Sequence, residues 1–233
     1  MSISLLPTFD TDGYQVEPST DKLNEVIAAI NESGGGGGGD TYPMNPGIWY
    51  DNRTAMAGKD GDDVLMEPDT VYGGLIRITD PDANLTAVAL APVFLAPPAT
   101  TTTVRLSLNA VSETGASRGL PGENIADLGT IVIPDDWDGS SLPTATPNVA
   151  VSPGYYWICI SATTNDLSVF GFQAYSHYLG MVNGAVGETT VCSGITVASP
   201  GAHTSMPATL VGVVTPADRV EIAPLIFFQV TPT

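Results

Sequence analysis

Positively charged residues are scarce in this sequence. It contains 7 Lys and Arg residues against 25 Asp and Glu residues, which gives a formal net charge of −18 at pH 7. Nucleic acids and anionic membrane surfaces are both bound chiefly through Lys and Arg. The charge balance therefore argues against a nucleic-acid or membrane-surface partner and favours other proteins, or neutral or basic ligands.

Cysteine and histidine are also scarce. The two cysteines, Cys159 and Cys192, belong to no C-x-x-C pair, so the sequence supports neither a disulfide scaffold nor a zinc or redox site. The sequence leaves two alternatives for this pair, namely two reduced, buried thiols or one disulfide bridge, and buried thiols are the commoner state. The two histidines, His177 and His203, have no acidic or thiol partner at metal-ligand spacing. We therefore expect no metal site and no cofactor.

Long apolar runs are missing as well. No stretch approaches the roughly 18 apolar residues of a membrane-spanning helix. Residues 1–7 contain neither the basic segment nor the long apolar segment of a secretory signal peptide. We expect no membrane insertion and no signal peptide.

Glycine and proline, in contrast, are abundant, with 25 and 19 residues. Residues 34–39 are six consecutive glycines, which cannot hold a helix or pack a core because each lacks a Cβ atom and loses the most freedom when fixed. This run predicts a hinge, or a close turn between two differently built parts of the chain. It separates an N-terminal part from a body that we expect to span residues 40–233.

Residues 1–20 mix apolar residues with turn formers and predict an extended segment with too little apolar area to fold alone. One interpretation is a frayed terminus. The alternative, which we favour, is an attachment peptide that lies along another protein. Its apolar residues are Ile3, Leu5, Leu6 and Phe9.

One short helix is expected over residues 21–33. Ser19, Thr20 and Asp21 are all good N-caps, and Asp21 also places negative charge at the positive end of the helix dipole. The apolar residues recur at three- and four-residue spacing and form one stripe; they are Leu23, Val26, Ile27 and Ile30.

This helix needs a partner. Burial of its four large apolar side chains gives roughly 6–12 kcal/mol, whereas ordering about eleven residues costs roughly 1–2 kcal/mol each. The wide, β-branched stripe favours a bundle of three identical helices. The alternative is that the helix packs on its own body, which the glycine hinge permits.

From residue 40 onward, short apolar or alternating runs are separated by turn residues about every ten positions, which is typical of an all-β sandwich or barrel. No crossover helices are available for a parallel α/β fold. Residues 52–63 are polar and rich in glycine and predict a loop. The predicted strands cover residues 48–50, 71–78, 86–95, 103–111, 125–133, 154–162, 167–175, 188–197, 209–214 and 219–230.

Two of these strands carry further predictions. Strict alternation in residues 103–111 places Val104, Leu106, Leu108 and Ala110 toward the core. Two adjacent glycines, at 73 and 74, indicate a bulge or bend in the strand over residues 71–78.

One pattern matches a catalytic motif. Residues 115–119 read G-A-S-R-G, the form of the nucleophile elbow of α/β-hydrolases, with Ser117 in the nucleophile position. That elbow requires a helix directly after the serine, and Leu120, Pro121 and Gly122 cannot begin one. A triad would nominally be completed by His177 or His203 together with Asp127 or Asp135. However, the predicted all-β class is not that of an α/β-hydrolase. We expect no catalytic residues.

Acidic and aromatic residues supply weaker candidates. The acidic clusters at residues 60–63 and 135–138 do not match the EF-hand spacing, so solvated loop charge is the simpler interpretation. Aromatic side chains can stack on sugar rings, although most will lie in the core. Those near predicted loops include Trp49 and Tyr50, and the candidates for glycan contact are Trp137, Tyr175, His177 and Tyr178.

Three stretches resemble a known module. They are V-R-L-S-L at residues 104–108, G-L-P-G-E-N-I-A-D-L-G-T-I at 119–131 and V-S-P-G-Y-Y-W-I-C-I at 151–160. Together they resemble a jelly-roll-like module of bacteriophage tail fibres and other virion appendages. Residues 20–31 are similar to the short oligomerising helix of phage tail and fibre proteins. Residues from Leu179 onward match neither pattern.

The resemblance implies a jelly-roll-like β-sandwich, preceded by the extended peptide and the short helix. It also implies a structural protein of a phage virion, made in the host bacterial cytoplasm. We expect a homotrimeric fibre or capsid decoration, attached to other virion proteins through its N-terminus, with the sandwich a candidate for binding host surface glycans. The alternative is a non-viral carbohydrate-binding or adhesin module.

Overall fold

The computed structural model describes residues 8–9, 15–16, 44–55, 58–93, 98–113, 117–174 and 193–233. The chain divides into two units, Met1–Thr41 and Tyr42–Thr233. In the first unit, β1 (Thr8–Phe9) pairs with β2 (Gln15–Val16) in antiparallel fashion. The predicted helix at residues 21–33 and the glycine hinge at 34–39 lie outside the described residues.

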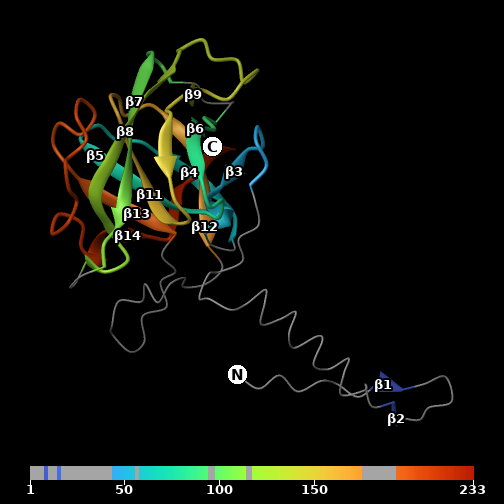
Figure 1. Ribbon diagram of the computed structural model, residues 1–233. Helices are drawn as coiled ribbons and strands as arrows, with labels where there is room; N and C mark the ends of the chain where they lie inside the picture. The colour runs from blue at the N-terminus through green and yellow to red at the C-terminus, as the bar shows by residue number, and fades with distance from the viewer. Residues whose placement is uncertain are drawn as a thin grey trace. The chain divides into compact units, whose positions relative to one another are not determined.

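The second unit is built from antiparallel sheets (Figure 1), which confirms the predicted all-β, sandwich-like fold. The six-stranded sheet has the order β14 (Arg219–Val220), β13 (Gly194–Ala198), β5 (Thr70–Ile78), β11 (Gly154–Ala162), β7 (Thr102–Val111), β8 (Pro121–Ile133). The second sheet has the order β10 (Val149–Val151), β6 (Ala83–Leu90), β16 (Ile226–Pro232), β3 (Tyr50–Asp51), with β9 (Thr144–Ala145) also on β6. The three-stranded sheet has the order β15 (Ile222–Pro224), β12 (Ser168–Ala174), β4 (Gly58–Leu65).

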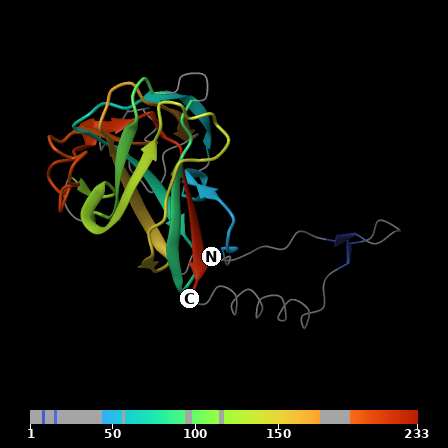
Figure 2. The ribbon, with the colours of Figure 1, turned by 90° about the horizontal axis from the view of Figure 1, so that it is seen from above.

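Helical structure in this unit includes two short 3-10 turns, η1 (Asn52–Thr54) and η3 (Pro216–Asp218). Within the described ranges, no helix has the length and apolar character needed to cross a membrane. Figure 2 shows β6 and β16 side by side, in agreement with their long antiparallel register.

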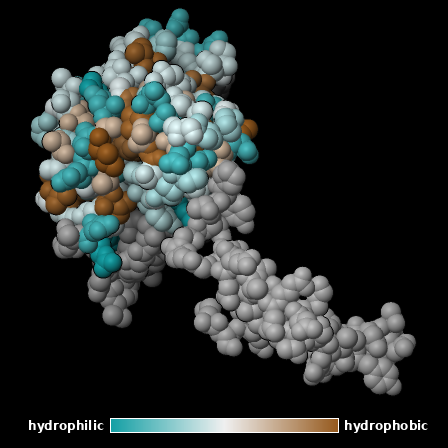
Figure 3. Space-filling model, viewed as in Figure 1, coloured by the Kyte–Doolittle hydropathy of each residue, from teal (hydrophilic) through white to brown (hydrophobic). Residues whose placement is uncertain are grey.

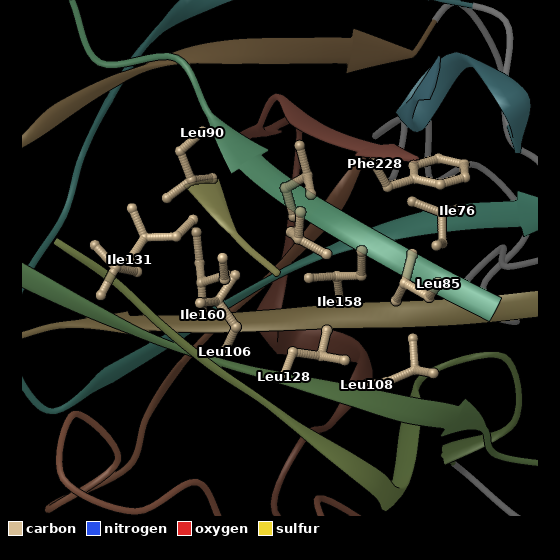
Figure 4. Close-up of a cluster of buried hydrophobic side chains, with 14 of the residues drawn as sticks. Ile76, Leu85, Leu90, Leu106, Leu108, Leu128, Ile131, Ile158, Ile160 and Phe228 are labelled. Carbon is tan, nitrogen blue, oxygen red and sulfur yellow. The ribbon is translucent and has the colours of Figure 1, made fainter. Parts of the chain in front are cut away.

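The main core lies between the six-stranded sheet and the strands β6 and β16. Side chains from the two layers point toward one another, with Leu85 and Leu90 of β6 facing Ile158 and Ile160 of β11 (Figure 4). Alternation along β7 buries Val104, Leu106 and Leu108, as predicted, whereas Ala110 is only partly buried. The core forms here because apolar residues recur at alternate positions along these strands.

A buried asparagine joins the two layers. Asn52 of η1 is fully buried, and its Oδ1 accepts a hydrogen bond from the Ile226 amide at 2.7 Å. Its Nδ2 donates to the Pro224 carbonyl at 3.3 Å. A Cβ atom on Gly74 of β5 would lie 2.4 Å from that Nδ2. The side chain therefore holds the β15–β16 corner against β5.

Three predictions about local structure are wrong. The glycines at 73 and 74 form no bulge, because β5 pairs residue by residue with β11 through both; they permit close packing instead. Residues 52–63, expected as a loop, include η1 and most of β4. The strand forms because its backbone pairs with β12, although its polar sequence has no apolar alternation that would predict a strand. Residues 209–214 form a turn, since Gly212 has φ +76° and reverses the chain.

Candidate functional site

The exposed apolar side chains mark where the described body could meet a partner. They include Ile48, Trp49, Leu65, Ile125, Val132, Phe170, Val211 and Val213. On the face seen in Figure 3, apolar side chains form small groups separated by hydrophilic ones. Among the tryptophans, Trp157 is fully buried and Trp137 partly buried, whereas Trp49 is 37% exposed. Trp49 is therefore the best placed to contact a ligand.

Trp49 directly precedes β3, which lies at one edge of the second sheet. Tyr50 follows it in β3, pairs with Phe228 of β16, and packs its ring 5.9 Å from the Phe228 ring. Successive side chains of an extended chain point to opposite faces. Trp49 therefore points outward beside Gln229, whose Nε2 donates to the Gly47 carbonyl at 3.1 Å.

Neutral polar side chains continue this surface across the sheet. On β16, Gln229 and Thr231 alternate with the buried residues of the core, and on β6 Asn84 pairs in register with Thr231. We call the set Trp49, Asn84, Thr86, Gln229 and Thr231 the Trp49 face. Its members are all uncharged, although the chain as a whole carries a net charge of −18.

A β-bulge positions Thr86 on this face. The register between β16 and β6 shifts between Gln229 and Val230, which leaves Thr86 as the extra residue. A bulge of this kind redirects a side chain. The Thr86 hydroxyl lies 3.4 Å from the Gln229 carbonyl and 3.4 Å from the Thr231 hydroxyl.

This arrangement suits a neutral ligand that is rich in hydroxyl groups. An exposed indole offers a flat apolar platform, and nearby hydroxyl and amide groups supply donors and acceptors that set orientation. Trp49 is not among the predicted glycan contacts, although the sequence carries a signal for it. Two consecutive aromatics in a strand must face opposite sides, so one of Trp49 and Tyr50 had to point outward.

Trp137, a predicted glycan contact, closes the loop that follows β8. Its side chain packs against the main core, and its Nε1 donates to the Ser141 carbonyl at 3.0 Å. In the same loop, hydrogen bonds from the Ser140 hydroxyl and amide lower the pKa of Asp138. Much of the indole therefore serves to order this loop.

The other predicted site residues cannot be placed. The oligomerisation residues Leu23, Val26, Ile27 and Ile30 lie outside the described residues, as do three attachment residues and three glycan candidates. These are Ile3, Leu5, Leu6, Tyr175, His177 and Tyr178. Phe9 is the exception, because its backbone belongs to β1.

The nucleophile-elbow interpretation gains no support. Ser117 lies in a tight turn that leads into β8, with its carbonyl accepting from the Leu120 amide at 2.9 Å. The two acids proposed for the triad have other partners, since Asp127 binds Arg105 and Asp135 accepts from Thr101. The chain after Ser117 continues as a strand, where an elbow requires a helix.

Metal and thiol chemistry are also unsupported in the described ranges. There, no three His, Cys, Asp or Glu side chains come close enough together to hold a metal ion. Cys159 carries a free thiol that is fully buried, and burial raises its pKa. A thiol of this kind is inert, because the thiolate is the reactive form.

No protein-family model matches the chain, and no curated protein is significantly similar to it.

Proposed function

We propose that this chain is a structural protein of a phage virion, a homotrimeric fibre or capsid decoration. Its N-terminus attaches it to other virion proteins, and its β-sandwich displays a surface for host glycans. The sequence resemblance and the predicted order of peptide, helix, hinge and body support the virion role.

The observation that carries the glycan part of the proposal is the Trp49 face. It combines an exposed indole with uncharged hydrogen-bonding side chains on a rigid sheet, which is a suitable platform for sugar rings. The net charge of −18 favours neutral glycans over acidic ones.

The trimer is tested by the mass of the full-length chain in solution, measured by light scattering. We expect three times the chain mass of 24.1 kDa. The double substitution Val26→Asp with Ile30→Asp places charges in the predicted seam and should give monomers. The matched control, Asn24→Asp with Asn31→Asp, adds the same charges outside the apolar stripe of the predicted helix and should remain trimeric. A monomeric full-length chain would refute the trimer.

The glycan surface is tested on an array of neutral and acidic glycans. We expect retention on neutral glycans, with Trp49→Ala weakening binding at least about tenfold, since removal of a central aromatic contact typically costs more than 1 kcal/mol. Val132→Ala, which changes an exposed apolar residue elsewhere, is the control and should bind normally. Equal binding by Trp49→Ala and the unchanged chain would remove the Trp49 face from the proposal.

The second candidate function is a non-viral carbohydrate-binding or adhesin module, which the Trp49 face suits equally well. The two candidates differ in assembly, because a binding module has no need of a trimerising helix. A monomer that retains neutral glycans would therefore favour the second candidate.

A further inference from the structure

A second surface, on the three-stranded sheet, has a different chemistry from the Trp49 face. It begins at a bulge between β12 and β4, where Val169 pairs with Val64 and Gly171 pairs with Gly61. Phe170 alone therefore stands opposite two residues of β4, Asp62 and Asp63. Bulges of this kind re-aim side chains and interrupt regular pairing.

Close backbone packing holds this bulge in place. A Cβ atom on Gly171 would lie 2.1 Å from the Asp62 carbonyl oxygen and 2.6 Å from Cγ2 of Ile222. Only glycine fits such an approach. Consequently the bulge is built into the packing, and with it the outward direction of Phe170, which is 41% exposed.

A second exposed apolar side chain, Leu65, lies on the same face as Phe170. Val169 and Val64 point into the main core, so their neighbours Ser168, Phe170 and Leu65 point outward. Leu65 pairs with Ser168 and is 53% exposed. On the other side of β12, the Val93 amide donates to the Ser168 carbonyl at 2.9 Å. We call Leu65, Val93, Ser168 and Phe170 the β12 patch.

Exposed carboxylates border the β12 patch along β4 and the residues that follow it. Asp62 and Asp63 stand opposite Phe170, and Glu67 follows two residues after Leu65; all three are exposed. The basic residue of β4, Lys59, lies at the far end of the strand opposite Gln173. The β12 patch is therefore an apolar surface, and Asp62, Asp63 and Glu67 form a negatively charged rim beside it.

The rim coincides with a sheet edge. In the order β15-β12-β4, β4 is the terminal strand, so one of its edges has no strand beside it in the described part of the sheet. A free edge offers backbone donors and acceptors to an added strand. Acidic side chains on such an edge repel other acidic chains and select basic ones.

A second copy of this chain is a poor occupant of the edge. It brings a net charge of −18 and only 7 basic residues, so its approach to Asp62, Asp63 and Glu67 is repulsive. A basic segment from a different protein is attracted instead. Its apolar side chains would cover Leu65 and Phe170 while its Lys or Arg side chains meet the carboxylates.

We propose that β4 and the β12 patch form a docking site for an extended segment of another protein, in which Lys or Arg alternates with apolar residues. The segment adds as a strand along β4. The inference is independent of the Trp49 face and holds for either function proposed above.

The test uses the full-length chain and a fluorescein-labelled Lys-Val alternating octapeptide as the probe, with binding read by fluorescence anisotropy. We expect saturable binding that weakens with added salt. A Glu-Val octapeptide should not bind. The Lys-Val probe with alternate residues N-methylated, which cannot form strand hydrogen bonds along one edge, should bind at least about tenfold more weakly.

Paired variants separate docking from general attraction to an acidic protein. Two double variants should each weaken binding at least about tenfold. One is Leu65→Ser with Phe170→Ser, and the other is Asp62→Asn with Asp63→Asn. The controls are Ile125→Ser with Val132→Ser and Asp135→Asn with Asp136→Asn, which make the same changes elsewhere and should stay within about twofold. Binding that is absent, or that the control pairs weaken equally, would overturn the proposal.

A second readout does not depend on the variants. Hydrogen exchange of the amides in Gly58–Leu65 should slow when the Lys-Val probe binds, because an added strand protects edge amides. Saturable binding with no added protection in β4 would place the probe elsewhere and would also overturn the proposal.

Discussion

Replacement of Asn52 by alanine tests how the two layers of the sandwich are joined. The substitution removes the acceptor of the Ile226 amide and the donor to the Pro224 carbonyl, both in a fully buried position. Each buried polar group left without a partner costs about 1–3 kcal/mol. With two such groups, we expect Asn52→Ala to lower the free energy of unfolding by about 2–6 kcal/mol.

The assay is equilibrium urea unfolding at fixed protein concentration, followed by tryptophan fluorescence, together with thermal melts. For a domain of this size, the expected loss corresponds to a fall in Tm of about 4–24 °C. Asn148→Ala is the matched control, because Asn148 is exposed in the segment before β10, and its effect should stay within about 0.5 kcal/mol.

The acid variant of the same position adds a pH signature. In Asn52→Asp the introduced carboxyl group can bond the Pro224 carbonyl only when protonated, and burial also favours the neutral form. Its folded pKa is therefore raised, so this variant should be most stable at low pH and lose stability as the pH rises through that pKa. An Asn52→Ala variant as stable as Asn148→Ala, or an Asn52→Asp variant without added pH dependence, would refute this account of the layer contact.

Two further predictions concern β4 and its neighbours. Gly171→Ala should destabilise the chain by about 1–3 kcal/mol in urea unfolding, because its Cβ atom would meet the Asp62 carbonyl at 2.1 Å. The control is Gly154→Ala, whose nearest contact is 3.8 Å and which should be neutral or slightly stabilising. Equal effects of the two substitutions would contradict the packing argument. Tyr72 donates to the Leu65 carbonyl at 3.1 Å, and desolvation raises its pKa above the ordinary value of 10.0. Its neutral form is thus favoured in the folded state, so its stabilising contribution is complete below pH 10 and is lost as the pH rises through the folded pKa. Tyr72→Phe should be less stable at neutral pH but show a smaller further loss in alkaline urea titrations; an unchanged alkaline loss would be evidence against this assignment.

Strands with a strong pattern were predictable because the sequence itself carries their periodicity. Residues 154–162 were predicted as a strand and form β11 with the same bounds. In β7 the alternation of Val104, Leu106 and Leu108 identified the buried face. An all-β fold followed from many such runs separated by turns, since this pattern requires no knowledge of which strands pair.

The candidate sites were far less predictable from sequence. Trp137 and Trp49 are the same residue type near predicted turns, yet one packs on the core and the other is exposed. The difference arises from the register of β3 with β16, a contact between residues almost the whole body apart. Local patterns do not encode such long-range pairing.

The sequence by itself determined the acidic charge, the all-β class and the inward residues of the strongest strands, because composition and short periodicity express these directly. Only the tertiary structure decided that residues 58–65 form the strand β4, that Gly171 packs closely on a neighbouring carbonyl, and that Asn52 connects the two layers. Each of these features depends on a segment that is distant in the sequence. The strand β12 pairs with β4, the Asp62 carbonyl lies close to Gly171, and the Ile226 amide binds Asn52. The surface that partners meet belongs to this second group, because packing selects which side chains remain outside.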